Sequence, residues 1–373
     1  MSTVALVALA RPTFDLACAQ ANFDSARALL QDLGATVVGP AELVMTVEDV
    51  AAVTLPEADL HILFMASFSD ASPAVELLGK VRGPILGWSM REPGEVGERL
   101  KLNSMCGVNL AAHALMDAGQ SIRHIHGNAD EPHVRQAIAN AIKGELPPAV
   151  TPSPISGELA SQSVADEAFA WLKGKRVGAV GDAPVGFTPC LFDGPKLNSL
   201  FGLDVRQISI DNAFDRISKV ETDRADKAYA SALAAQPSLG DVNVEQAKKV
   251  YGVEVALDDW REEDALDAIA IRCWPEFPTD LGACICSSLG RLSDRGTVTT
   301  CERDVLGAVT MLVCEALGSD ENYLVDIVDL VEKEGLLRLW HCGSAATKLA
   351  ADPQSATQYI HCNRKLGVAG NFP

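Results

Sequence analysis

The sequence lacks the features of a membrane, secreted or nucleic-acid-binding protein. No run reaches the roughly 18 apolar residues of a transmembrane helix. The N-terminal stretch MSTVALVALARPTFD is apolar but has no basic segment before it, so it predicts a buried first strand rather than a signal peptide. Basic residues are few, 31 against 50 acidic ones, and a net charge of −19 repels nucleic-acid phosphates and anionic membranes. We therefore expect a cytoplasmic protein with no nucleic-acid or membrane partner.

Several well-known catalytic motifs are also missing. The chain has no G-x-S-x-G elbow and no G-x-x-x-x-G-K-[ST] phosphate loop, so serine-triad and P-loop chemistry have no residues to support them. The glycines of KRVGAVGDAPVGF do not have the dinucleotide-binding spacing, and we interpret this stretch as a structural turn. The ten cysteines form no closely spaced framework, which argues against a disulfide scaffold.

What the sequence does contain is a regular alternation of apolar strand-length runs and helical patterns. With 373 residues and 48% hydrophobic content, the chain is long enough for two or three globular domains. Such alternation predicts parallel sheets with helices on both faces. We therefore predict an α/β fold with two doubly wound, Rossmann/flavodoxin-like domains at 1–150 and 160–343. Residues 344–373 are expected to begin a C-terminal barrel-like domain that is cut short.

The individual elements follow from the same patterns. In the first domain we expect strands at 4–9, 36–38, 60–64 and 84–88, and helices at 17–33, 46–54, 74–81 and 108–118. The proline-rich stretch 143–159 predicts a domain connection. In the second domain we expect strands in KRVGAVG, DVRQISI, DAIAIRCW, TVTTC, YLVDIV and LLRLWHC, with helices around 212–235, 244–251, 281–292 and 304–317.

Three side chains of metal-binding type stand at or near predicted strand ends. Glu302 follows TVTTC and precedes a helix, Asp326 lies inside the apolar NYLVDIVDL, and His341 follows LLRLW. Ligands of open parallel sheets bind outside the carboxyl ends of strands. Two carboxylates and one imidazole suit Mn²⁺, Mg²⁺ or Co²⁺ better than structural zinc. The pattern is therefore a candidate metal site.

Each of these residues also has a structural alternative. Glu302 and Asp304 could both cap the following helix, and we assign Asp304 to that role. Asp326 could be a solvent-facing acid at a strand end. His341 could be a hydrogen-bonded core histidine. The residues alone leave these alternatives open.

The segments TTCERDVLGAVTML, YLVDIVDL and LRLWHCGSA together resemble the metal-binding region of the L-fucose/L-arabinose isomerase superfamily. The resemblance implies that Glu302 and Asp326 are metal ligands that also handle the proton, and that His341 is a third ligand. It implies Mn²⁺, or Mg²⁺ or Co²⁺, as the cofactor and a homo-oligomer, trimer or hexamer, as the assembly. A further histidine of the family's C-terminal domain has no counterpart here, because His361 comes too early.

Looser matches carry the resemblance to other parts of the chain. IAIRCWPEFP is similar to a strand and loop that reach the sugar, which implies substrate contacts for Trp274 and Glu276. ARPTFD resembles an Arg-Pro motif that directs Arg11 to the sugar. LGWSMREPG is similar to a segment whose aromatic residue, here Trp88, reaches a neighbouring subunit's site. Trp340, beside His341, is also assigned to substrate binding.

The resemblance implies a metal-dependent aldose–ketose isomerase. This reaction moves a proton between C1 and C2 through a cis-enediol, and it needs a cation and a positioned carboxylate. The expected substrate is a deoxyhexose, a pentose or an anionic sugar such as a sulfonated hexose. Arg11, Arg91, Arg99 and Lys101 could meet an anionic group, although solvated surface is the default for each. The alternative is a non-catalytic sugar-binding or regulatory protein on a two-lobed α/β scaffold.

Overall fold

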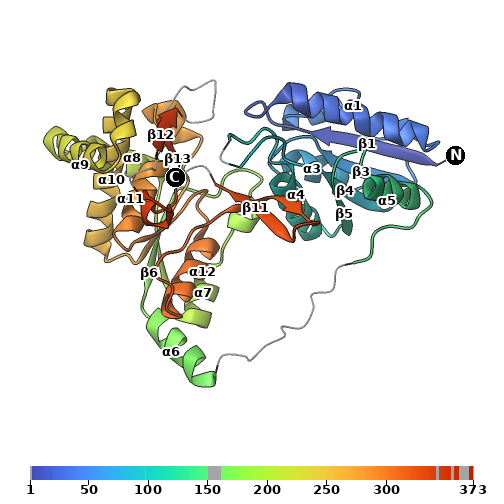
Figure 1. Cartoon of the computed structure of the whole chain (residues 1–373). Helices are drawn as coiled ribbons and strands as arrows, with labels where there is room; N and C mark the ends of the chain where they lie inside the picture. The colour runs from blue at the N-terminus through green and yellow to red at the C-terminus, as the bar shows by residue number, and fades with distance from the viewer. Residues whose placement is uncertain are drawn as a thin grey trace. The chain divides into compact units, whose positions relative to one another are not determined.

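The computed structural model describes residues 2–96, 98–149, 161–341 and 344–353, together with the backbone of 357–360 and 369–372. The chain forms two compact units (Figure 1). Unit 1 consists of Met1–Ile155, Val185–Pro189 and Asp326–Trp340. Unit 2 consists of Ser156–Pro184, Cys190–Val325 and His341–Pro373.

Unit 1 is built on a five-stranded parallel sheet with the order β2-β1-β3-β4-β5. Its strands are β1 (Thr3–Leu9), β2 (Thr36–Val38), β3 (Leu60–Met65), β4 (Ile85–Ser89) and β5 (Ile122–His126). Its helices are α1 (Leu16–Asp32), α2 (Val47–Val50), α3 (Ser72–Leu78), α4 (Ser104–Asp117) and α5 (Pro132–Ile142). Figure 1 shows α1 alongside β1.

Both faces of the unit 1 sheet are buried, because successive side chains of a strand point to opposite faces. Leu6 and Ala8 of β1 pack with apolar residues of α1 and α5. Val7 and Leu9 pack with those of α2, α3 and α4. This is why β1 is apolar at every position instead of alternating.

Unit 2 repeats the plan with a four-stranded parallel sheet, ordered β7-β6-β8-β9. Its strands are β6 (Arg176–Val180), β7 (Asp204–Ile208), β8 (Ala268–Ile271) and β9 (Val298–Thr300). One face packs against α8 (Ile210–Ser218), α10 (Val244–Asp264) and α11 (Cys286–Asp294). The other packs against α6 (Gln162–Leu172), α7 (Gly194–Phe201) and α12 (Val305–Ala316). Helix α9 (Thr222–Ala235) packs on α10, and β12 (Thr357–Ile360) pairs with β13 (Ala369–Phe372).

The remaining strands, β10 (Asp326–Val331) and β11 (Leu336–Trp340), form an antiparallel hairpin. This hairpin belongs to unit 1, where β10 contacts α4. Asp326 comes late in the sequence, directly after the sheet of unit 2. It nevertheless belongs to unit 1. The predicted range 160–343 treated this segment as part of the second domain.

The predicted α/β class with two parallel sheets is confirmed. Strand β5 and helix α5 were not predicted, and the expected helix 46–54 is only the four-residue α2. The strand expected in YLVDIV begins at Asp326 instead. His361, Gly343 and residues 150–159 of the predicted connection lie outside the described residues. Among the described helices, none combines the length and low polarity that crossing a bilayer requires.

Candidate active site

Glu302 stands at the carboxyl end of the unit 2 sheet, in the turn between β9 and α12. Glu302 and Arg303 have φ angles of 58° and 57°, a left-handed conformation that residues other than glycine rarely adopt. The backbone N–H of Arg303 donates to the carbonyl of Ile271 at 3.0 Å, so the turn is tied to the neighbouring strand β8. Strained backbone of this kind concentrates at functional sites.

Trp274 contacts the Glu302 carboxylate. Nε1 of Trp274 donates to Oε1 of Glu302 over 3.4 Å. Trp274 follows β8 and Glu302 follows β9, and these strands are neighbours in the sheet. The structure therefore brings these two predicted site residues together within unit 2.

Glu276 lies on the same loop and forms an ion pair. Its Oε1 lies 2.7 Å from Nη2 of Arg272, and Oε2 accepts from Nε of Arg272 at 2.9 Å. A two-pronged pair of this type fixes both side chains. The Glu276 carboxylate is thus a neutralised group at the sheet edge rather than an isolated charge.

Asp304 begins helix α12, as predicted. Its side chain accepts a hydrogen bond from the backbone N–H of Gly307 at 2.7 Å, which is the N-cap contact. Burial raises the pKa of Asp304 above its usual value, although the backbone N–H groups of Gly307 and Leu306 counteract this. The two acids of the Glu-Arg-Asp triplet therefore have different roles.

Asp326 is the first residue of β10, within unit 1. Its Oδ2 accepts a hydrogen bond from Nδ2 of Asn103 at 2.9 Å. Asn103 has a φ of 47° and stands at the N-cap of α4. The buried Glu92 carboxylate accepts the backbone N–H groups of Lys101, Leu102 and Asn103, which holds this segment in place. Trp340 is the partner of Asp326 in the hairpin register.

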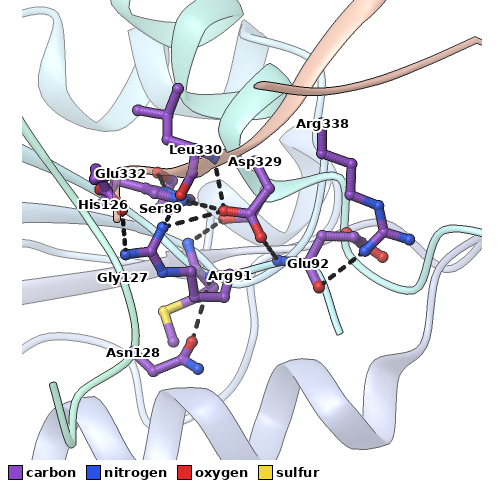
Figure 2. A network of polar contacts seen from close by, with 12 residues as sticks. Ser89, Arg91, Glu92, His126, Gly127, Asn128, Asp329, Leu330, Glu332 and Arg338 are labelled. Atoms are coloured by element: carbon purple, nitrogen blue, oxygen red, sulfur yellow. Dashed lines mark hydrogen bonds and ion pairs between the residues drawn. The ribbon is translucent and has the colours of Figure 1, made fainter. Parts of the chain in front are cut away.

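Asp329, three positions along β10 from Asp326, anchors the hairpin to the body of unit 1 (Figure 2). Its Oδ1 lies 2.6 Å from Nε2 of His126, and its Oδ2 accepts the backbone N–H of Glu92 at 3.1 Å. Burial alone would raise the pKa of Asp329, but the hydrogen bonds from His126, Glu92 and Arg91 lower it below its usual value. The hairpin position, and with it Asp326, depends on this contact.

Arg91 is occupied by the same network, which corrects its suggested role as a cation for an anionic group. Its guanidinium pairs with Glu131 at 3.0 Å, Glu332 at 2.8 Å and Asp329 at 3.3 Å. It also donates to the carbonyl of Leu330. With three carboxylates around it, Arg91 carries no uncompensated charge for a ligand.

The other predicted residues have different surroundings. His341 belongs to unit 2, has 8% of its surface exposed and contacts the Tyr323 ring, with 6.2 Å between ring centroids. Arg11 lies over the Phe68 ring at 5.8 Å in unit 1.

Trp88 has no exposed surface, and its Nε1 donates to the carbonyl of Gly127 at 2.8 Å. Its ring meets Phe64 edge-on within the core of unit 1. A side chain buried in this way packs the core, so the structure assigns Trp88 to the core of unit 1 and not to a contact with a neighbouring subunit.

The predicted metal ligands divide between the units. Glu302 and His341 belong to unit 2, and Asp326 belongs to unit 1. In the part of the chain that the structure describes, no group of three His, Cys, Asp or Glu side chains is gathered for a metal ion. The donor chemistry, two carboxylates and an imidazole, is of the kind that binds Mn²⁺, Mg²⁺ or Co²⁺.

Comparison with known proteins finds relatives that match the chain from end to end, while no protein-family model matches. A protein of Clostridium sp. (strain MSTE9) named sulfoquinovose isomerase is 30% identical over 374 residues, covering 99% of this chain and 78% of the relative. Proteins of the same name from Alkalicoccus urumqiensis and Priestia megaterium (strain ATCC 12872 / QMB1551) are 29% and 28% identical. Each match covers 100% of this chain and 80% or 79% of the relative.

Proposed function

This chain belongs to the sulfoquinovose isomerase family, and on that premise we propose that it converts a sulfonated aldose into the corresponding ketose. Sulfoquinovose is a glucose-type sugar that carries a sulfonate group. The observation that carries the proposal is the end-to-end similarity to relatives of that name. The alternative of a non-catalytic sugar-binding protein has no comparable support, because those relatives are named as enzymes.

The reaction moves one proton between C1 and C2 of the open-chain sugar through a cis-enediol. We assign this proton transfer to Glu302 and Asp326, since carboxylates held in one orientation are effective proton carriers. Trp274 donates to Glu302, and Asn103 donates to Asp326. These contacts support the assignment because they orient each carboxylate. The resemblance to the L-fucose/L-arabinose isomerase superfamily, on which these roles rest, is part of the proposal.

We further propose that Glu302, Asp326 and His341 hold a divalent cation, Mn²⁺ or else Mg²⁺ or Co²⁺. When bound, such an ion supplies positive charge that stabilises the negative charge developing on the sugar oxygens. The protein's own residues then bind and orient the substrate, and Trp274, Glu276, Trp340 and Arg11 are assigned to this task. Assembly into a trimer or hexamer stays a prediction.

The test is a direct assay of sulfoquinovose by proton NMR, with the protein first stripped by a chelator and then supplied with Mn²⁺. We expect conversion to the ketose with Mn²⁺ and loss of conversion with the chelator. In deuterated water, deuterium should also enter at C2 of recovered aldose or C1 of ketose, because a carboxylate exchanges its proton with solvent. No conversion under any metal condition would refute the proposal.

A further inference from the structure

Arg303, the middle residue of the Glu-Arg-Asp triplet, is a buried cation that forms no ion pair with the described residues. Only 6% of its surface is exposed. Among the described residues, neither Nε nor Nη1 of its guanidinium has a hydrogen-bond partner, and no carboxylate lies within ion-pair distance. A buried charge that is neither paired nor hydrogen-bonded is strongly unfavourable. The position therefore calls for an anion that is not part of the described chain.

The immediate surroundings of Arg303 supply no ion-pair partner. The charge of Asp182, which follows β6, acts on Arg303 from beyond ion-pair distance and does not offset the burial. Its Cζ atom lies 4.9 Å from the centre of the Phe192 ring, which covers the guanidinium with an apolar face. The adjacent Glu302 forms no described ion pair with it and instead accepts from Trp274. Arg272, a second cation of this sheet edge, is paired with Glu276. Within the described part of unit 2, Arg303 is thus a buried cation of this edge that has no ion pair.

The location suits an anionic ligand. Arg303 lies in the turn that starts α12, a helix of 12 residues whose N-terminus carries partial positive charge. The turn follows β9, at the carboxyl edge of the sheet where ligands of α/β proteins bind. A planar guanidinium offers two parallel N–H groups that match an oxyanion such as a sulfonate.

We propose that Arg303 recognises the sulfonate group of the substrate and so determines specificity for sulfonated over neutral sugars. The inference rests on the proposed function and deepens it. Glu302 and Asp326 act at C1 and C2, so the sulfonate at the far end of the sugar requires a separate residue. Arg303 meets that requirement because its guanidinium forms no ion pair with the described residues and two of its nitrogens have no hydrogen-bond partner there.

The experiment compares Arg303→Met and Arg303→Lys with the unchanged protein, using sulfoquinovose and its neutral counterpart glucose. Loss of a charge-assisted hydrogen-bond pair predicts a drop of about 10- to 100-fold in kcat/KM for sulfoquinovose, mainly through KM. The value for glucose should change less than about threefold, because glucose has no sulfonate. Arg303→Lys should keep part of the preference, since it retains the charge but not the planar fork.

Arg224→Met is the matched control. Arg224 also lies in unit 2, but it is exposed and pairs with Asp259 at 2.7 Å, so this change removes the same charge away from the sheet edge. We expect its kinetics on both sugars to equal those of the unchanged protein. Equal losses on sulfoquinovose and glucose in Arg303→Met, or no loss on either, would overturn the proposal.

Ligand binding separates this inference from the proposed function. Sulfoquinovose should raise the melting temperature of the unchanged protein more than that of Arg303→Met, whether or not turnover occurs. Inorganic sulfate serves as the probe for a site that merely accepts any oxyanion. If the protein binds sulfoquinovose through Arg303 but does not isomerise it, only the proposed function fails. If both proteins respond equally to sulfoquinovose, or if sulfate reproduces the whole response, the assignment of Arg303 to the sugar sulfonate fails.

Discussion

At the scale of single residues, Glu302, Arg303 and Asp304 are consecutive but have three different surroundings. Glu302 accepts from Trp274, Arg303 is buried over an aromatic ring, and Asp304 caps α12. The left-handed backbone at the first two positions separates these directions within one turn. Backbone strain of this kind persists only where the surrounding structure enforces it, as it often does at functional sites.

The first prediction concerns Glu302. Glu302→Gln keeps the shape of the side chain but cannot carry the proton, so kcat should fall by about 10²- to 10⁴-fold. The assay is initial-rate isomerisation of sulfoquinovose at saturating Mn²⁺. The control is Glu263→Gln, an exposed glutamate of unit 2 that pairs with Arg216 and should have unchanged kcat. A kcat for Glu302→Gln equal to that of the control would remove Glu302 from the mechanism.

Sequence reasoning found the acids of this turn but not its arginine. Glu302 and Asp304 are recognisable because acids after a strand and before a helix have known chemical uses. The importance of Arg303 depends on burial and on the absence of a described partner, and neither is visible in a single sequence. Arg91 is the opposite case, a cation that sequence reasoning treated as available for a ligand but that is paired in the structure. Its three carboxylate partners come from distant positions of the chain, so the pairing could not be predicted.

At the scale of secondary-structure elements, the hairpin β10–β11 carries Asp326 and is fixed mainly through Asp329. His126, Arg91 and the Glu92 backbone converge on that one carboxylate (Figure 2). Arg338 of β11 adds hydrogen bonds to the carbonyls of Glu92 and Gly94. Asp329 is therefore a positioning residue for Asp326.

The second prediction follows from this contact. Asp329→Asn should weaken the attachment of the hairpin by about 1.5–3 kcal/mol, because hydrogen bonds to a charged group are lost. Amide hydrogen exchange of residues 326–340 should speed up while β1 and β3 stay protected. Glu332→Gln is the control, since Glu332 is half exposed and contributes one contact to Arg91. Equal exchange in the two variants would show that Asp329 does not anchor the hairpin.

The third prediction concerns the start of α12. Asp304→Ala removes the N-cap and should lower the free energy of unfolding by about 1 kcal/mol, whereas Asp304→Asn should keep most of it. Urea unfolding followed by circular dichroism measures both variants. If alanine and asparagine cost the same, the cap contact to Gly307 is not what stabilises this helix.

Element prediction succeeded where apolar runs were long and failed where polar side chains interrupt them. Strand β5, sequence IRHIH, was missed because its arginine and two histidines interrupt the apolar pattern, although His126 is buried. His124 and His126 are accommodated by the Ser89 hydroxyl, which lies 2.8 Å from a ring nitrogen of each. The pairing of β10 with β11 was not predicted, although the short loop between them, which contains Gly335, is a hairpin signal.

At the scale of the whole molecule, acid should weaken unit 1 through the Asp329 network. The pKa of Asp329 is lowered on folding, so its contribution to stability is present above its unfolded value of about 3.9 and is lost as the pH falls through the lower folded value. The fourth prediction is that the difference in unfolding free energy between the unchanged protein and Asp329→Asn is constant near neutral pH and shrinks below about pH 4. Urea titrations at several pH values measure it. A difference that grows on acidification would have the wrong sign for this mechanism.

The fifth prediction concerns the proposed cation. A metal that binds only the folded protein raises the melting temperature by mass action. Mn²⁺ should therefore stabilise the unchanged protein, and Glu302→Gln and Asp326→Asn should each reduce the shift, because each removes one proposed ligand. Calorimetric titration with Mn²⁺ gives the affinity without reference to turnover, and Glu263→Gln again serves as control. Full affinity in Asp326→Asn would mean that the ion does not need the hairpin carboxylate, and the proton transfer assigned to Asp326 would then lose its basis.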